Sequence, residues 1–252
     1  DEVGPIDGPC IVLIHGLGLS KALWDSHLSA LTGCRVVRYD LYGHGNSAPA
    51  PRQADLTLYA DQIAGLLNHL NIRKAHIVGF SIGGMINRKF AQEYPNKVLS
   101  LSILNSPHDR GEEAQAAVEA RAQAVRDQGA FSTFDAALQR WFTPDYLATG
   151  DGPALVRHWR GIVDAESYTQ TAWVLANRVH ELIRPVPAIT KPTLVTTCEN
   201  DSGSTPAMSH DIASEIAGAE TMIVPHLQHL GLMEDPDAFT APVLNFIKRV
   251  TA

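Results

Sequence analysis

Cysteine, positive charge and long apolar runs are all scarce in this chain of 252 residues. Its three cysteines, Cys10, Cys34 and Cys198, show no C-x-x-C spacing, and an odd number cannot pair completely. We therefore expect buried free thiols and a reducing, cytoplasmic environment. No apolar run reaches the roughly 20 residues that a helix needs to cross a bilayer, so we expect no membrane partner.

Lysine and arginine together number 20, against 27 aspartates and glutamates, and the net charge is −7. A nucleic-acid surface needs clustered positive charge, so we expect no nucleic-acid partner. The histidines show neither H-E-x-x-H nor H-x-x-x-H spacing, which argues against a zinc site, and we expect no cofactor. Hydrophobic residues make up 45% of the chain and charged residues 19%, which suits one globular domain with an inserted lobe.

Short apolar runs alternate with amphipathic segments along most of the chain. The runs predict strands, and the amphipathic segments predict helices, at residues 10–14 (strand), 20–31 (helix), 35–39 (strand), 56–70 (helix), 75–78 (strand), 82–94 (helix), 98–104 (strand), 193–198 (strand), 206–217 (helix), 220–224 (strand) and 237–249 (helix). Such alternation is typical of a parallel sheet wrapped by helices. We therefore predict an α/β fold with a mostly parallel, doubly wound sheet.

The alternation is interrupted between residues 108 and 185, where alanine, glutamine and arginine are frequent and no strand is predicted. Helical periodicity there predicts three helices, at residues 112–128, 134–141 and 167–183. Several prolines between 185 and 192 mark the return to the alternating pattern. We interpret residues 108–185 as a helical cap inserted into a core that consists of residues 1–107 and 186–252.

The most informative motif is G-F-S-I-G at residues 79–83. It places Ser81 at the corner between a predicted strand and a predicted helix. A serine in such a sharp, strained turn presents its hydroxyl above the sheet, and the flanking glycines avoid a Cβ that would crowd the neighbouring strand and helix. This context favours a nucleophile elbow over a simple turn of glycine and serine.

A serine hydroxyl is a weak nucleophile at neutral pH and needs a base, usually a histidine that a carboxylate orients. Downstream of Ser81 the chain supplies Asp201 after the strand at 193–198 and His229 after the strand at 220–224. All three residues follow strands, and α/β sheets carry their sites at the carboxyl ends of strands. We therefore predict a catalytic triad of Ser81, His229 and Asp201.

Two residues compete for places in this triad. Glu199 precedes Asp201 in the same loop, but Asp201 lies farther from the strand end, in a turn from which a carboxylate can reach the histidine loop. His226 follows Pro225 at the end of its strand and is interpreted as an exposed loop residue. His229 is favoured because an apolar stretch that can wall a pocket follows it.

Acyl transfer also needs hydrogen-bond donors for the oxyanion of the tetrahedral intermediate. The backbone N–H of Ile82, directly after the serine and at the positive end of the predicted helix, is expected to be one donor. The second is expected in the loop H-G-L-G at residues 15–18, at the N–H of Leu17. Alone this loop indicates only a glycine-rich turn, and its significance comes from its combination with the elbow.

These motifs resemble those of the α/β-hydrolase superfamily over nearly the whole chain. The matching segments are H-G-L-G at 15–18, D-L-Y-G-H-G-N-S at 40–47, G-F-S-I-G-G at 79–84, Asp201, and the stretch 229–236. The compact size and the cap segment R-W-F-T-P at 140–144 are similar to the 3-oxoadipate enol-lactonase and small carboxylesterase group. The resemblance implies an α/β-hydrolase fold and no cofactor.

Together the residues and the resemblance predict a serine hydrolase that cleaves a small-molecule carboxylic ester or lactone through an acyl-enzyme. Carbon–carbon bond hydrolases and perhydrolases use the same triad, and ligand receptors on hydrolase scaffolds can retain it, so these stay as alternatives. Epoxide hydrolases and haloalkane dehalogenases are disfavoured because the elbow residue is serine. In the cap we expect Trp141 to touch substrate, with packing of the cap on the core as its alternative role.

Overall fold

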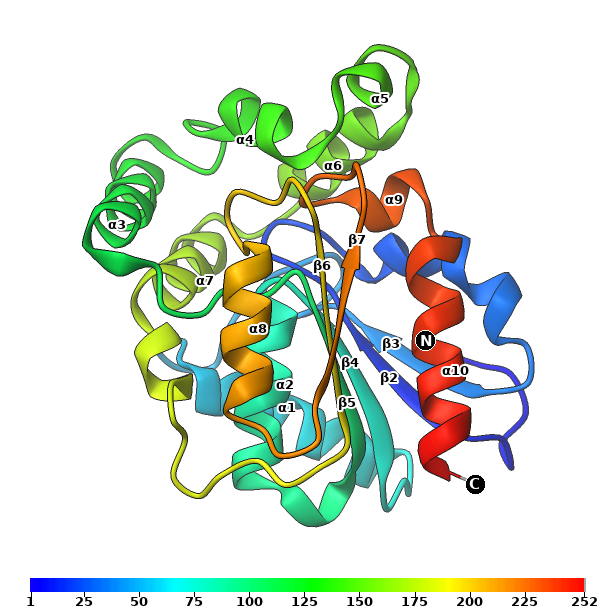
Figure 1. Ribbon diagram of the computed structural model, residues 1–252. Helices are drawn as coiled ribbons and strands as arrows, with labels where there is room; N and C mark the ends of the chain where they lie inside the picture. The colour runs from blue at the N-terminus through cyan, green and yellow to red at the C-terminus, as the bar shows by residue number, and fades with distance from the viewer. Residues whose placement is uncertain (252) are drawn as a thin grey trace.

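The apolar runs of the sequence form the centre of the molecule. The computed structural model describes residues 1–251, and in it a seven-stranded sheet runs through the core (Figure 1). In spatial order its strands are β1 (Glu2–Val3), β3 (Arg35–Tyr39), β2 (Cys10–Ile14), β4 (Ala75–Phe80), β5 (Val98–Leu104), β6 (Thr193–Cys198) and β7 (Glu220–Val224). β1 pairs antiparallel with β3, and the other pairings are parallel, so the predicted mostly parallel sheet is confirmed.

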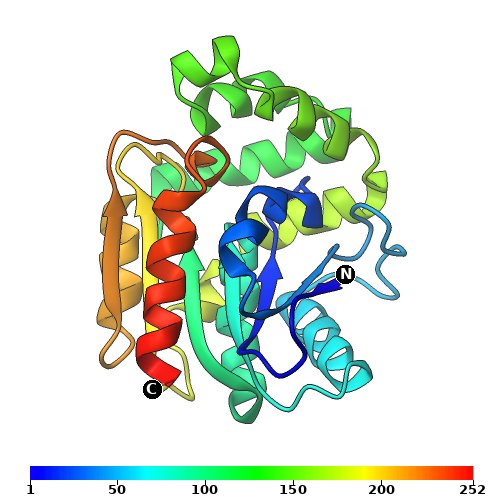
Figure 2. The ribbon, with the colours of Figure 1, turned by 90° about the vertical axis from the view of Figure 1, so that its right-hand side faces the viewer.

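Helices cover both faces of this sheet (Figures 1 and 2). One face packs against α1 (Leu56–His69), α2 (Ile82–Glu93) and α8 (Pro206–Ser214), and the other against the 3₁₀ helix η1 (Lys21–Leu31) and α10 (Asp237–Thr251). Successive strand residues point to opposite faces, so Val12 packs in one apolar cluster and Leu13 in the other. The doubly wound arrangement predicted from the alternation is therefore present.

Five α-helices, followed by a short 3₁₀ turn, separate β5 from β6 along the chain, and α-helices of this segment arch over the carboxyl ends of the strands (Figures 1 and 2). They are α3 (Gly111–Gln128), α4 (Phe134–Trp141), α5 (Pro144–Thr149), α6 (Gly152–Gly161) and α7 (Ala165–Asn177). In the described part of the chain no strand lies between residues 105 and 192. This layer faces the edge of the sheet at which the strand-end residues gather.

The helices differ from the sequence prediction in several places. The helix predicted at 167–183 ends at Asn177, and after Arg178 the chain forms a separate 3₁₀ turn, η3 (Val179–Leu182). Val179 and Leu182 pack into the apolar cluster under α1 and α2, which requires the chain to leave the axis of α7. The segment predicted as a helix after Ser20 is a 3₁₀ helix, capped by the Ser20 hydroxyl on the N–H of Ala22.

α5 and α6 were not predicted. α5 has a readable start, because the Thr143 hydroxyl accepts from the N–H of Tyr146 and Pro144 occupies the first helical position. α5 has six residues, too few for an apolar period to stand out, whereas α6 has ten and buries Val156 and Trp159 at helical spacing, a pattern that the sequence prediction missed. The short edge strand β1 and the 3₁₀ helix η2 (Pro95–Lys97) also carry too few residues for a periodic pattern.

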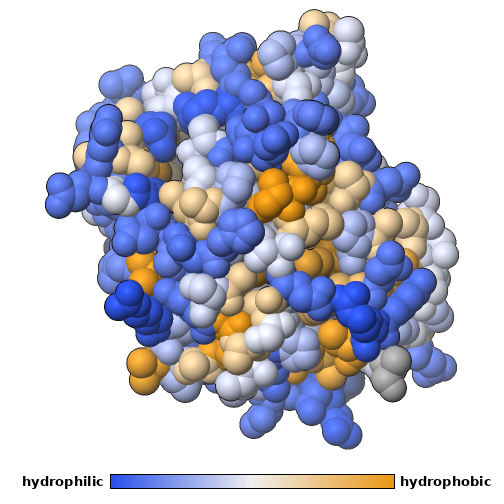
Figure 3. All heavy atoms as spheres, in the orientation of Figure 1, coloured by the Kyte–Doolittle hydropathy of each residue, from blue (hydrophilic) through white to orange (hydrophobic). Residues whose placement is uncertain are grey.

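The surface shown in Figure 3 carries hydrophilic and apolar side chains in mixed distribution. On the face seen in Figure 1 hydrophilic side chains predominate over the cap, and apolar side chains gather in small separate groups (Figure 3). Among residues 1–251 no helix combines the length and the apolar character that crossing a membrane requires.

Candidate active site

Ser81 occupies the corner between β4 and α2 in a conformation that few L-residues adopt, with φ 58° and ψ −117°. The turn is crowded on both sides. A Cβ at Gly79 would lie 2.1 Å from the carbonyl oxygen of Gly83, and one at Gly83 would lie 2.7 Å from that of Ile14. The glycines therefore permit the tight turn, and backbone strain of this kind concentrates at functional sites.

The structure brings Ser81, His229 and Asp201 together, although they come from three separate loops. His229 Nε2 lies 3.2 Å from Ser81 Oγ, and His229 Nδ1 lies 2.7 Å from Asp201 Oδ2. An ionised Asp201 can only accept a hydrogen bond, so His229 carries its proton on Nδ1 and donates it to the carboxylate. Nε2 then has a free lone pair and accepts a hydrogen bond from the Ser81 hydroxyl. The arrangement can therefore remove the proton from Ser81 as its oxygen attacks an electrophile.

Asp201 is 2% exposed and is held by donors on both carboxylate oxygens. Oδ1 accepts from the N–H groups of Gly203 and Ser204, each at 2.9 Å, and Oδ2 accepts from Asn105 Nδ2 at 3.0 Å as well as from His229. Burial opposes ionisation, but the charge of His229 and these hydrogen bonds outweigh it, so the pKa of Asp201 lies below its usual value. The carboxylate stays charged at neutral pH.

The two competing residues lie outside this chain of hydrogen bonds. The Glu199 carboxylate is half-exposed and accepts from the backbone N–H of His226 at 2.8 Å. The His226 side chain is 90% exposed, and its Nδ1 lies 3.7 Å from Glu199. Glu199 and His226 thus contact each other at the surface, away from Ser81.

The loop at residues 15–18 is held in place by two buried histidines. His44 Nε2 accepts from the N–H of Gly18 at 3.1 Å, and His15 Nε2 accepts from the N–H of Leu41 at 3.0 Å. Burial lowers the pKa of His15 to about 4 and that of His44 to about 3, so both rings are neutral and able to accept. Among residues 1–251 none accepts from the N–H of Leu17, the donor predicted from the sequence.

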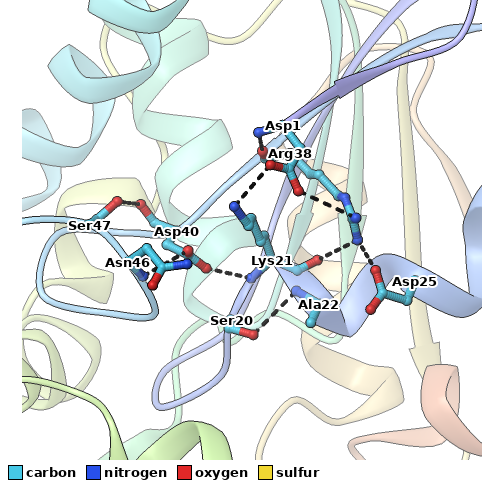
Figure 4. A network of polar contacts seen from close by, with 9 residues as sticks. All are labelled: Asp1, Ser20, Lys21, Ala22, Asp25, Arg38, Asp40, Asn46 and Ser47. Atoms are coloured by element: carbon cyan, nitrogen blue, oxygen red, sulfur yellow. Dashed lines mark hydrogen bonds and ion pairs between the residues drawn. The ribbon is translucent and has the colours of Figure 1, made fainter.

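Hydrogen bonds of Asp40 hold the loop at residues 40–47, which includes His44 (Figure 4). The Asp40 carboxylate accepts from the N–H groups of Lys21 at 2.7 Å and Asn46 at 3.1 Å, and its carbonyl accepts from the Ser47 hydroxyl at 2.7 Å. A Cβ at Gly45, where φ is 51°, would lie 2.3 Å from Asp40 Cγ, so this position requires glycine. The motif at residues 40–47 was recognised in the sequence, but its supporting role becomes visible only in these contacts.

A cavity of about 140 Å³ lies between the helices α3 to α7 and the strand ends, and Ser81, His229 and Leu17 line it. Trp141 lines it as well, with its ring centroid 6.2 Å from that of His229. The Trp141 carbonyl also accepts from the N–H of Leu230 at 2.8 Å, which ties α4 to the histidine loop. Within the described residues no three His, Cys, Asp or Glu side chains are grouped so that they could hold a metal ion.

Four arginines from the cap segment line the same cavity, namely Arg110, Arg121, Arg140 and Arg160. The carboxylate among the lining residues is that of Asp201, which is engaged with His229. Nothing in the sequence marked these arginines as a group, because they are spread over 50 residues and several separate helices. The cavity is thus more positive than the chain, whose net charge is −7.

Comparison with known families agrees with this site and fold. Residues 11–241 match the model of the alpha/beta hydrolase family. The chain therefore belongs to the alpha/beta hydrolase family and is a hydrolase, and the predicted resemblance is confirmed.

Individual proteins of known name are similar to this chain in sequence and in structure. The chain is 30% identical to 3-oxoadipate enol-lactonase 2 from Acinetobacter baylyi over 251 residues, covering 98% of this chain and 91% of the relative. A crystal structure of the enol-lactonase from Burkholderia xenovorans LB400 superposes with a TM-score of 0.85 at 28% identity, covering 98% of this chain and 95% of that one. A thermophilic esterase from Thermogutta terrifontis gives a TM-score of 0.81 at 25% identity, with coverage of 100% and 93%.

Proposed function

We propose that this hydrolase cleaves a carboxylic ester or lactone through an acyl-enzyme on Ser81. The observation that carries the proposal is the unbroken hydrogen-bonded chain from Ser81 through His229 to the buried Asp201, at the wall of a cavity. The names of the relatives, enol-lactonases and an esterase, support the same bond class. No cofactor enters the proposed reaction.

In the proposed reaction Ser81 Oγ attacks the carbonyl carbon while His229 Nε2 takes the serine proton. The C–O bond of the ester then breaks, and His229 returns that proton to the departing oxygen. Water next attacks the acyl carbon, again with His229 as base, and releases the acid and the free serine. Asp201 holds the imidazole tautomer and stabilises the imidazolium throughout.

We propose the backbone N–H groups of Leu17 and Ile82 as the donors that hold the oxyanion. Leu17 lines the cavity in the loop that His15 and His44 support. Ile82 is the first residue of α2, and the first four N–H groups of a helix have no acceptor within it. The positive end of α2 adds to the stabilisation of negative charge there.

We further propose that residues 108–185 act as a cap that covers Ser81 and sets specificity over a core of residues 1–107 and 186–252. The cavity supports this division, because cap side chains form one wall of it and strand-end residues the other. Trp141 is the proposed contact for substrate. It stands beside His229 and can shield the acyl group from water.

The cysteines, the net charge and the cavity support proposals about where the protein works and what it binds. Cys10, Cys34 and Cys198 are free and buried, which supports a reducing, cytoplasmic location. The net charge of −7 and the small cavity support a small molecule as the partner rather than nucleic acid.

Turnover of 4-nitrophenyl acetate tests the proposed bond class. We expect multiple turnovers by the wild-type protein and none by Ser81→Ala. Binding of small ligands without turnover would point instead to a receptor on a hydrolase scaffold. Activity restricted to carbon–carbon bond cleavage, or to peracid formation with added hydrogen peroxide, would assign the same triad to one of the alternative reactions.

Asp201→Asn is expected to lower kcat by about 10⁴, because an amide favours the wrong imidazole tautomer and cannot stabilise the imidazolium. The matched control is Glu199→Gln, which makes the same carboxylate-to-amide change in the same loop but on a half-exposed side chain. Steady-state kinetics on 4-nitrophenyl acetate compares them. If Glu199→Gln were the damaging change, the carboxylate of the triad would have to be reassigned.

Trp141→Ala tests the proposed contact with substrate. We expect the ratio of kcat/KM between a long and a short acyl 4-nitrophenyl ester to change, because the indole forms an apolar wall for the acyl chain. An equal loss on both esters, together with a lower melting temperature, would show that Trp141 only packs the cap against the core.

A further inference from the structure

Arg160 is the most deeply buried of the arginines in the cavity, with 2% of its surface exposed. It projects from α6 into an aromatic enclosure. Its guanidinium carbon lies 4.9 Å from the ring centroid of Phe134 and 5.1 Å from those of Trp141 and Tyr168. A Cβ at Gly18 would lie 3.0 Å from Arg160 Nε, so the guanidinium also contacts the loop proposed to hold the oxyanion.

The charge of Arg160 is not balanced by the protein. Its Nε atom has no hydrogen-bond partner within residues 1–251, and its Nη1 atom makes one long contact, 3.5 Å, to the carbonyl of Ala130. Among residues 1–251 no carboxylate forms an ion pair with Arg160 either. Burial lowers its pKa, which reflects the cost of holding this charge away from water. An anion that entered the cavity would supply the missing partner.

A second positive position lies on α3 and α4. Arg121 and Arg140 are partly buried, both line the cavity, and within residues 1–251 neither forms an ion pair. Burial and then the charge of Arg140 lower the pKa of Arg121, so the two like charges act on each other. Arg140 Nη1 donates to the carbonyl of Ala136 in its own helix, and its other donors stay available for a ligand.

These two positions are separate. Arg160 lies on α6 inside the enclosure of Phe134, Trp141 and Tyr168, whereas Arg121 lies on α3 and Arg140 near the end of α4. Arg140 and Trp141 are neighbours on α4 and therefore point about 100° apart around the helix axis. Because Trp141 faces Arg160, Arg140 faces a different part of the cavity wall.

We propose that the substrate is a compact ester or lactone whose acyl part carries two carboxylates, one bound by Arg160 and one by Arg121 and Arg140. This proposal rests on the proposed function, because Arg160 stands beside the loop that would hold the reacting carbonyl. Carboxylates suit guanidinium groups, which bind their two oxygens with parallel N–H donors. The volume of about 140 Å³ favours a compact acyl group, since a cavity of about 150 Å³ holds a benzene molecule.

The test compares three 4-nitrophenyl esters on the wild-type protein: the butyrate, the monoester of succinate, and the monoester of tricarballylate. Their acyl groups carry no, one and two free carboxylates. We expect kcat/KM to rise by about 10-fold or more with each carboxylate, as charge-assisted hydrogen bonds in a buried site predict. Added salt should reduce the advantage of the charged esters.

Variants assign the positions. In Arg160→Met, whose unbranched side chain can fill the aromatic enclosure without charge, the tricarballylate-to-butyrate ratio of kcat/KM should fall by about 10-fold or more. Arg140→Gln should lower the tricarballylate-to-succinate ratio. The control is Arg52→Met, where the arginine pairs with Asp55 at 2.7 Å at the surface and does not line the cavity, and it should leave both ratios unchanged.

Equal rates on the three esters, or a preference for the butyrate, would overturn the proposal. A higher kcat/KM for the succinate ester than for the butyrate, with no further rise for the tricarballylate ester, would show that the cavity binds one carboxylate and not two. Calorimetry on the wild-type protein supplies a measurement that needs neither turnover nor a folded variant, and glutarate should bind at least about 10-fold tighter than butyrate. If glutarate binds with this preference but none of the esters is hydrolysed, the proposed function is wrong and the proposed anion site is still supported.

Discussion

Ser81→Ala is expected to lower kcat for 4-nitrophenyl acetate by about 10⁶, the loss that removal of a triad nucleophile produces. The fold should persist, because Ser81 already holds a Cβ at a φ of 58° and the change removes only the hydroxyl. The hydroxyl's hydrogen bond within the described chain is to His229 Nε2, which faces the cavity, so water there can replace the lost partner. Steady-state kinetics and calorimetric melting measure the two effects.

The matched control for this substitution is Ser209→Ala. Ser209 is buried on α8 outside the cavity, and among residues 1–251 its hydroxyl has no hydrogen-bond partner. We expect wild-type turnover from this variant. Near-wild-type activity in Ser81→Ala would remove the serine from the proposed chemistry.

His229→Ala is expected to be about as damaging as the serine substitution, with a loss on the order of 10⁶ in kcat, since nucleophile and base act as one unit. Without Nε2, no side chain among residues 1–251 is left within hydrogen-bond reach of Ser81 Oγ to take its proton. The double variant Ser81→Ala, His229→Ala should lose little more than either single one. Such non-additivity is the expected behaviour of a triad and not of two independent binding residues.

His226→Ala is the control for that variant, because it removes an imidazole three residues away on a side chain that is 90% exposed. We expect its kcat to stay within about a factor of 2 of wild type, as for surface substitutions generally. A reversed order, with His226→Ala inactive and His229→Ala active, would show that the loop rearranges and that the base has been assigned to the wrong residue.

The sequence predicted those parts of the molecule that local patterns determine. Each strand of the parallel sheet is a short apolar run, and the sheet's connectivity fixes which strand ends meet. Ser81, Asp201 and His229 each follow such a strand, so their convergence could be expected before any distance was known. The choice of Asp201 over Glu199 depended on a difference of two positions in one loop, and the backbone donors of Gly203 and Ser204 account for where that carboxylate points.

The arrangement of residues 108–185 was less predictable, because helical periodicity indicates that a segment is a helix but not how neighbouring helices cross. The enclosure of Arg160 joins Phe134 and Trp141 on α4 to Tyr168 on α7, a grouping that depends on how three short helices cross. The support that His44 gives to Gly18 spans 26 residues and could not be derived from spacing alone. The residues proposed to set specificity are therefore those for which the structure adds most.

The central claim, that Ser81 is an activated nucleophile, is tested most directly by covalent labelling. The wild-type protein is treated with a fluorophosphonate, digested, and the peptide that contains residues 79–83 is sequenced by mass spectrometry. We predict stoichiometric modification of Ser81, its absence in Ser81→Ala, a strongly reduced rate in His229→Ala and an unchanged rate in His226→Ala. An unlabelled Ser81 in the folded wild-type protein, or modification of another residue at the same rate, would contradict the account.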